Sequence, residues 1–265
     1  MDSLADIKHL ILDMDGVLYR GSRPMPRLRE FFSFLREKPI PFILVTNNAT
    51  RTPRERSEKL SAMGVEVLPS EILVSGQAVA RYLRRDYPAG TRVHVFGMPA
   101  LAEAMREEGF VPADEDVKVV VAGVNLEMTY PKVKRAVDLI RGGARFIATN
   151  LDPNIPSEDG FLPGSGSMVA MLATASEVRP TAVGKPEPIM YELAMAQMGA
   201  GPATTAAVGD RVATDIVGGK RAGMATICVL SGASSRAEAE AAGADFIFEH
   251  IGELLDAWRA ALSHG

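Results

Sequence analysis

Residues 9–16 read HLILDMDG, an apolar run followed by two aspartates and a glycine, and this segment indicates both the fold class and a candidate site. The run His9–Leu12 is short and almost entirely apolar, which is typical of a strand buried on both faces. Ligands of parallel sheets bind beyond the carboxyl ends of the strands, where Asp13 and Asp15 would lie. A turn just past the strand can aim both carboxylates at one point, and Gly16 lets the chain turn closely there.

Similar apolar runs recur along the chain and alternate with segments of helical spacing. The other predicted strands are Phe42–Val45, Ile72–Val74, Val93–Phe96, Val117–Val121, Phe146–Ala148, Thr205–Val208, Ala225–Val229 and Phe246–Phe248. Between them, apolar residues at i, i+3, i+4 and i+7 predict helices, for example over Leu28–Leu35. Alternation of this kind requires crossover connections, so we predict an α/β fold with a mainly parallel sheet covered on both faces.

The composition excludes several classes of protein. The chain has 265 residues, 47% of them hydrophobic and 23% charged, which is ordinary for a globular protein and argues against disorder. Its net charge of −4 gives no basic footprint for nucleic acid, and no apolar run approaches the length of a membrane span. The single cysteine, Cys228, cannot form an internal disulfide, which fits a reducing compartment. With no signal peptide visible at the N-terminus, we expect a cytoplasmic protein without a membrane or nucleic-acid partner.

Polar residues also mark three further places along the chain. They are Thr46-Asn47-Asn48 after one predicted strand, Gly209-Asp210 through Asp215 after another, and Gly184-Lys185-Pro186 before a predicted helix. Each has an ordinary explanation as a turn, a helix start or a surface lysine. An ordered set at several strand ends is much less easily produced by chance.

The four aspartates predict a metal site. Asp13, Asp15, Asp210 and Asp215 would raise one another's pKa if they met at one edge of the sheet, and a divalent cation relieves that repulsion. Oxygen ligands combined with a phosphate suit Mg²⁺ best. An EF-hand calcium loop does not fit, because no third ligand has the required spacing before Gly16. Lys185 would add a positive charge that can face a phosphate or Asp13.

The four motifs, in this order, resemble the haloacid dehalogenase-like hydrolase superfamily. They are Asp13-Met14-Asp15-Gly16-Val17-Leu18-Tyr19, Leu44-Val45-Thr46-Asn47-Asn48, Gly184-Lys185-Pro186, and Gly209-Asp210-Arg211-Val212-Ala213-Thr214-Asp215-Ile216. The second and fourth look specifically like the NagD-like, p-nitrophenylphosphatase-type phosphatases. The resemblance implies a Rossmann-like three-layer core with an α/β cap inserted between the second and third motifs. We therefore expect core segments at 1–89 and 180–265 and a cap at 90–179.

The resemblance also implies roles for individual residues in a Mg²⁺-dependent phosphomonoesterase. Asp13 would be the nucleophile that forms an aspartyl-phosphate, and Asp15 the general acid and base. The implied metal-site residues are Asp13, Asp15 through its backbone carbonyl, Asp210 and Asp215; the implied phosphate-binding residues are Thr46, Asn47, Asn48 and Lys185; the implied cap loop that faces the leaving group holds Asn150, Asp152, Asn154 and Ile155.

The implied substrate is a small phosphorylated metabolite, such as a sugar phosphate, a nucleoside monophosphate or phosphoglycolate. Pyridoxal phosphate phosphatases tend to carry a histidine just before the position of Pro156, where this chain has Ile155, so that substrate is disfavoured. Alternatives are a phosphoacceptor signalling module, a catalytically inactive binding protein on the same fold and, more weakly, a phosphomutase. The oligomeric state, including a homodimer, is left open.

Overall fold

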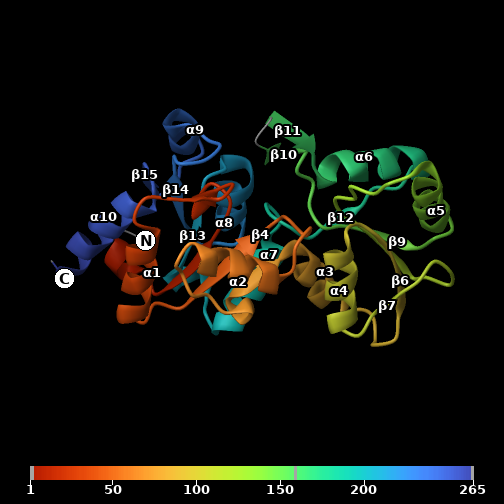
Figure 1. Cartoon of the computed structure of the whole chain (residues 1–265), viewed down its shortest axis with the longest axis horizontal. Helices are drawn as coiled ribbons and strands as arrows, with labels where there is room; N and C mark the ends of the chain where they lie inside the picture. The colour runs from red at the N-terminus through yellow and green to blue at the C-terminus, as the bar shows by residue number, and fades with distance from the viewer. Residues whose placement is uncertain (1–2, 158–159, 264–265) are drawn as a thin grey trace. The chain divides into compact units, whose positions relative to one another are not determined.

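The computed structural model describes residues 3–157 and 160–263, and the chain divides into two compact units (Figure 1). The first unit comprises Met1–Thr46, Pro53–Leu73 and Lys185–Gly265, and the second comprises Asn47–Thr52 and Val74–Gly184. The chain thus leaves the first unit and later returns to it. The sequence-based boundaries at residues 90 and 179 stay a prediction.

The first unit is built on a six-stranded sheet in the order β15-β14-β13-β1-β4-β5. Its strands are β1 (His9–Leu12), β4 (Phe42–Thr46), β5 (Ile72–Val74), β13 (Thr205–Gly209), β14 (Ala225–Val229) and β15 (Phe246–Phe248). The pairs β1–β13, β1–β4, β13–β14 and β14–β15 are parallel. Leu12 pairs with Val208 on one side and Leu44 on the other, so the carboxyl ends of β1, β13 and β4 reach the same edge of the sheet.

Helices cover this sheet because its strands are apolar on both faces. Every residue of β4, β13 and β14 is buried. The helices are α1 (Leu28–Glu37), α2 (Pro53–Ala62), α7 (Pro188–Met198), α8 (Val217–Arg221), α9 (Arg236–Ala241) and α10 (Ile251–Ser263). Helix α1 packs against α10, where the rings of Phe34 and Trp258 lie 5.7 Å apart between centroids, and α7 packs against α8. The prediction of a parallel α/β core is confirmed.

The second unit has a parallel sheet of its own, in the order β12-β9-β8-β6-β7. Its strands are β6 (Arg92–Phe96), β7 (Val111–Pro112), β8 (Val119–Ala122), β9 (Arg145–Ala148) and β12 (Thr181–Ala182), and its helices are α3 (Ser75–Leu83), α4 (Pro99–Glu107), α5 (Tyr130–Arg141) and α6 (Ser165–Ser176). Helix α3 packs on α4 and α5 on α6 (Figure 1). A buried cluster that includes Phe96, Val120 and Leu172 forms its core.

Several short strands went unpredicted. Antiparallel strands β10 (Asn154–Ser157) and β11 (Gly160–Pro163) form a hairpin where a loop was expected, so Asn154 and Ile155 lie in a strand. Strands β2 (Tyr19–Arg20) and β3 (Arg23–Pro24) form a second small antiparallel pair. These segments carry proline and lack a continuous apolar run, so only their pairing partners define them.

The structure also bears on a membrane location. Over residues 3–157 and 160–263, no helix has the length and the apolar character needed to cross a bilayer.

Candidate active site

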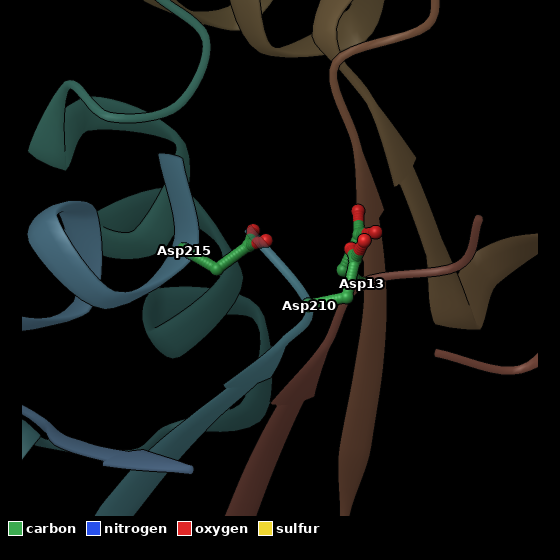
Figure 2. A group of neighbouring side chains, drawn as sticks. All are labelled: Asp13, Asp210 and Asp215. Atoms are coloured by element: carbon green, nitrogen blue, oxygen red, sulfur yellow. The ribbon is translucent and has the colours of Figure 1, made fainter. Parts of the chain in front are cut away.

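Three carboxylates meet at the carboxyl edge of the first unit's sheet (Figure 2). Asp13 follows β1 and Asp210 follows β13, and the parallel register of these two strands places the two residues side by side. Asp215 comes from a π-helical turn, Val212–Ile216, and reaches toward the other two. One oxygen of each carboxylate lies within 4.8 Å of the others. Three of the four aspartates expected at this edge of the sheet therefore lie together.

Lys185, which is 172 positions from Asp13 in the sequence, completes the cluster. Its ammonium Nζ donates hydrogen bonds to Asp13 Oδ1 at 2.5 Å and to Asp215 Oδ1 at 2.6 Å. The lysine is only 3% exposed, so both contacts are shielded from water. Charge-assisted bonds of this length fix the position of both carboxylates.

Burial and mutual repulsion dominate the electrostatics of the cluster. Burial raises the pKa of Asp13 well above its usual value; Lys185 offsets part of the rise, and Asp215 and Asp210 add to it. Burial and then Asp215 raise the pKa of Asp210 to about 6. Burial alone would lower the pKa of Lys185. The charges of Asp13 and Asp215 outweigh this effect, so the pKa of Lys185 is raised. One ammonium therefore does not compensate three carboxylates, and a divalent cation suits the remaining charge.

The backbone around the cluster orients its carboxylates. Asp210 Oδ2 accepts a hydrogen bond from the Ala233 amide at 2.8 Å, and Asp215 Oδ2 accepts one from the Arg211 amide at 3.1 Å. Gly16 has a φ of +88°, and a Cβ at that position would lie 2.5 Å from Asp210 Oδ2. A glycine is required there for both reasons. The resulting set of fixed, oxygen-only donors is the kind that a hard cation such as Mg²⁺ or Ca²⁺ prefers.

Asp15 stands apart from the three clustered carboxylates. Its side chain is 53% exposed, and its Oδ2 lies 3.9 Å from Nη1 of Arg56, a residue of α2 that is 3% exposed. Arg56 was not among the site residues predicted from the sequence. The available signal was its spacing, because Pro53, Arg56 and Leu60 form the buried face of α2, and a charge at such a position needs a partner.

The remaining predicted residues fall into two groups. Thr46 ends β4 and is buried beside β1. In the second unit, Asn150 Nδ2 donates a hydrogen bond to the Asn47 carbonyl at 2.6 Å, and Asn47 Nδ2 donates one to Asp152 Oδ2 at 3.1 Å. Asn48 instead accepts hydrogen bonds from Thr50. Asn47, Asn150 and Asp152 therefore form one network.

Comparison with known proteins gives a family for this geometry. A model described as haloacid dehalogenase-like hydrolase matches residues 10–111, and a HAD-hydrolase-like model matches residues 182–254. An acid sugar phosphatase of Staphylococcus aureus strain MRSA252 is 39% identical over 229 residues, which cover 86% of this chain and 88% of that protein.

Two solved structures are also similar. NagD from Escherichia coli K-12 has a TM-score of 0.87 at 33% identity, covering 93% of this chain and 98% of that one. A glycerol phosphate phosphatase from Mycobacterium tuberculosis, in complex with magnesium, has a TM-score of 0.89 at 32% identity, covering 96% of this chain and 78% of that one. The chain therefore belongs to the haloacid dehalogenase-like hydrolases and is one of their NagD-like phosphatases.

Proposed function

We propose that this phosphatase hydrolyses monoesters of small phosphorylated metabolites, depends on Mg²⁺ and forms an aspartyl-phosphate on Asp13. One observation carries the proposal: Asp13, Asp210 and Asp215 share a site, and Lys185 bonds to two of them. The arrangement offers a nucleophile, a cation site and a fixed positive charge within a few ångströms. Phosphoryl transfer needs these parts, because its catalysis consists largely of positioning and charge stabilisation.

The reaction proceeds in two steps. A carboxylate oxygen of Asp13 attacks phosphorus, the bond from phosphorus to the ester oxygen breaks, and Asp15 gives its proton to the departing alcohol. Water then attacks the aspartyl-phosphate and its proton passes to the Asp15 carboxylate. The acyl-phosphate P–O bond breaks, which releases inorganic phosphate and restores both aspartates.

The metal site of the proposal consists of Asp13, Asp210 and Asp215, with the predicted backbone carbonyl of Asp15. Bound Mg²⁺ supplies positive charge that reduces repulsion between the anionic ester and the carboxylates. The magnesium complex of the mycobacterial relative and the oxygen-only donors of this cluster support the choice of metal.

Lys185 and Thr46 are proposed to bind the equatorial phosphoryl oxygens. Lys185 is buried and its ammonium is held in place by Asp13 and Asp215, so it is preorganised for an anion. Thr46 ends the strand adjacent to β1, and its hydroxyl can donate to a phosphoryl oxygen. The same role for Asn47 and Asn48 stays a prediction.

We further propose that the second unit is the cap that selects the leaving group. In that unit the buried Asn150 bonds to the Asn47 carbonyl and to the Asp152 amide, and so it fixes Asp152, a partly exposed carboxylate of the kind that accepts hydrogen bonds from hydroxyls. The names of two relatives, an acid sugar phosphatase and a glycerol phosphate phosphatase, favour polyhydroxylated leaving groups. A sugar phosphate or a polyol phosphate is therefore the proposed substrate class.

The test combines metal removal with a change to the nucleophile. Purified protein is assayed for phosphate release from sugar, polyol, nucleotide and p-nitrophenyl phosphates, with Mg²⁺ or with EDTA. We expect turnover only with Mg²⁺ and the highest kcat/KM for a polyhydroxylated ester. Asp13→Asn should abolish both turnover and the labelled phosphoprotein seen after rapid acid quench with ³²P-substrate. Full activity of Asp13→Asn would contradict the mechanism, and a stable phosphoprotein without turnover would indicate a phosphoacceptor module instead.

A further inference from the structure

Helix α2 directs a buried guanidinium toward the proposed acid and base. Arg56 is 3% exposed although arginine is normally a surface residue, and it shares the buried face of α2 with Pro53 and Leu60. Packing on that face fixes the stem of the side chain. Its Nη1 lies 3.9 Å from Asp15 Oδ2.

Asp15, unlike Arg56, is exposed to solvent. Its side chain is 53% exposed. Its backbone lies within a turn closed by a hydrogen bond from the Leu18 amide to the Met14 carbonyl, next to a second bond from the Gly16 amide to the Tyr19 carbonyl. Asp15 and Tyr19 also form a β-bridge. The backbone of Asp15 is therefore fixed, while its exposed carboxylate still has rotamer freedom.

A second residue of α2 reinforces the contact with this turn. The ammonium of Lys59 lies 3.7 Å from the centroid of the buried Tyr19 ring, one helical turn from Arg56. Burial first, and then the charge of Asp15, raise the pKa of Tyr19, so its phenol stays neutral at physiological pH. The neutral phenol of Tyr19 is thus not a counter-ion for the guanidinium.

The two aspartates of the motif therefore have different cations, Lys185 for Asp13 and Arg56 for Asp15. We propose that Arg56 is a positioning residue that holds the Asp15 carboxyl group in the orientation from which it passes its proton to the leaving group. This inference rests on the proposed function, because it takes Asp15 as the general acid. A rigid, buried guanidinium suits this task, because its position is already fixed and little conformational entropy is lost when the carboxyl group of Asp15 approaches it.

The effect of losing Arg56 depends on the leaving group of the substrate. An alkyl or sugar alkoxide is a poor leaving group and needs the proton of Asp15 as the bond from phosphorus to oxygen breaks. A p-nitrophenolate leaves readily and needs little protonation. Loss of Arg56 should therefore lower the rate of cleavage of the alkyl ester more than that of the p-nitrophenyl ester. The parameter to compare is kcat/KM, because it reports the steps up to formation of the aspartyl-phosphate and omits its later hydrolysis.

The experiment measures kcat/KM for glycerol phosphate and p-nitrophenyl phosphate in Arg56→Met and Arg56→Lys. For Arg56→Met we expect a loss of about 10- to 100-fold on glycerol phosphate and less than about threefold on p-nitrophenyl phosphate. Arg56→Lys keeps the charge on a different side chain and should fall between the wild type and Arg56→Met. Arg54→Met removes the same charge from the exposed face of α2, where the Arg54 side chain is 84% exposed, and should leave both values unchanged.

The variant Asp15→Asn distinguishes the positioning role of Arg56 from the general-acid role of Asp15. Asp15→Asn could lower kcat/KM selectively for glycerol phosphate while both Arg56 variants keep the wild-type ratio of the two kcat/KM values. In that case the inference on Arg56 is wrong and the proposed function stands. If Asp15→Asn does not discriminate between the esters, the general-acid assignment itself is wrong. Equal losses on both esters in the Arg56 variants would show a structural role only. The double variant Asp15→Asn with Arg56→Met should be no worse than Asp15→Asn alone, because both changes remove the same effect.

Discussion

Removing the charge of Asp210 should make the metal-free protein more stable, although it damages the proposed metal site. Asp210 is 7% exposed, and burial together with Asp215 raises its pKa from the usual 3.8 to about 6. The folded state therefore resists ionisation of this carboxyl more than the unfolded state does. Asp210→Asn keeps an oxygen that can accept the hydrogen bond from the Ala233 amide, and it removes the charge.

The size of the effect follows from linkage. The folded-state pKa lies above the unfolded-state value, so the folded state holds the proton more tightly between about pH 4 and pH 6, and stability falls as the pH rises through that window. At pH 7 the full difference corresponds to about 3 kcal/mol, and at pH 5 to about 1.5 kcal/mol. We expect Asp210→Asn to gain about 2 to 3 kcal/mol over the wild type at pH 7 in EDTA, and about half as much at pH 5.

The chain provides a suitable probe for this measurement. Its single tryptophan, Trp258, is fully buried in α10, in the same unit as Asp210, so its fluorescence reports unfolding of that unit. Urea titrations of both proteins at pH 5 and pH 7, with EDTA, give the two free energies of unfolding by linear extrapolation. Added Mg²⁺ should stabilise the wild type, by about 2.7 kcal/mol at 100 times its Kd, and Asp210→Asn much less.

Asp245→Asn is the matched control, because Asp245 accepts hydrogen bonds from the Thr226 amide and hydroxyl outside the cluster. It should gain no stability in EDTA, and its response to Mg²⁺ should match that of the wild type. The reasoning is refuted if Asp210→Asn is less stable than the wild type at pH 7 in EDTA. It is equally refuted if the difference between the two proteins is the same at pH 5 and pH 7.

Two further predictions address the ammonium of the site and the N-terminal cap of α9. Lys185→Met removes the buried partner of Asp13 and Asp215 and should lower kcat about 100-fold or more in steady-state assays with Mg²⁺; a loss within threefold would contradict its role. Ser235→Ala removes a capping box, in which Ser235 and Glu238 exchange hydrogen bonds at the start of α9, and should cost about 1 kcal/mol in a urea titration; an unchanged free energy of unfolding would contradict this.

The sequence predicted the sheets well because their strands are buried on both faces. Strands β1, β5 and β14 have the predicted bounds, and β8 begins at Val119 where Val117 was predicted. A continuous apolar run is the direct consequence of such burial, so it can be read without knowing the neighbouring strands. Asp13 and Asp210 were expected to meet for the same reason, since both immediately follow paired parallel strands.

Other features depend on partners that a local pattern does not reveal. Strand β12 has two residues, and its definition rests on pairing between Thr181 and Ile147. The network of Asn47 with Asp152 joins residues 105 positions apart. Lys185 lies 172 positions from Asp13, and only its motif indicated that the two would meet. The contact of Arg56 with Asp15 belonged to no motif, and only its spacing on α2 pointed inward.

Asp13 and Asp15 lie in different environments, although a continuous strand would have directed both side chains to the same side. Residues at i and i+2 of a strand face the same side. The side chains of Asp13 and Asp15 are nevertheless 12% and 53% exposed, because β1 ends at Leu12 and the chain turns at Gly16. The proposed roles require this difference. A nucleophile must stay fixed and dry, whereas an acid and base must exchange protons with a leaving group and with water. The turn after β1 thus gives two identical side chains the separate environments that the proposed two-step hydrolysis needs.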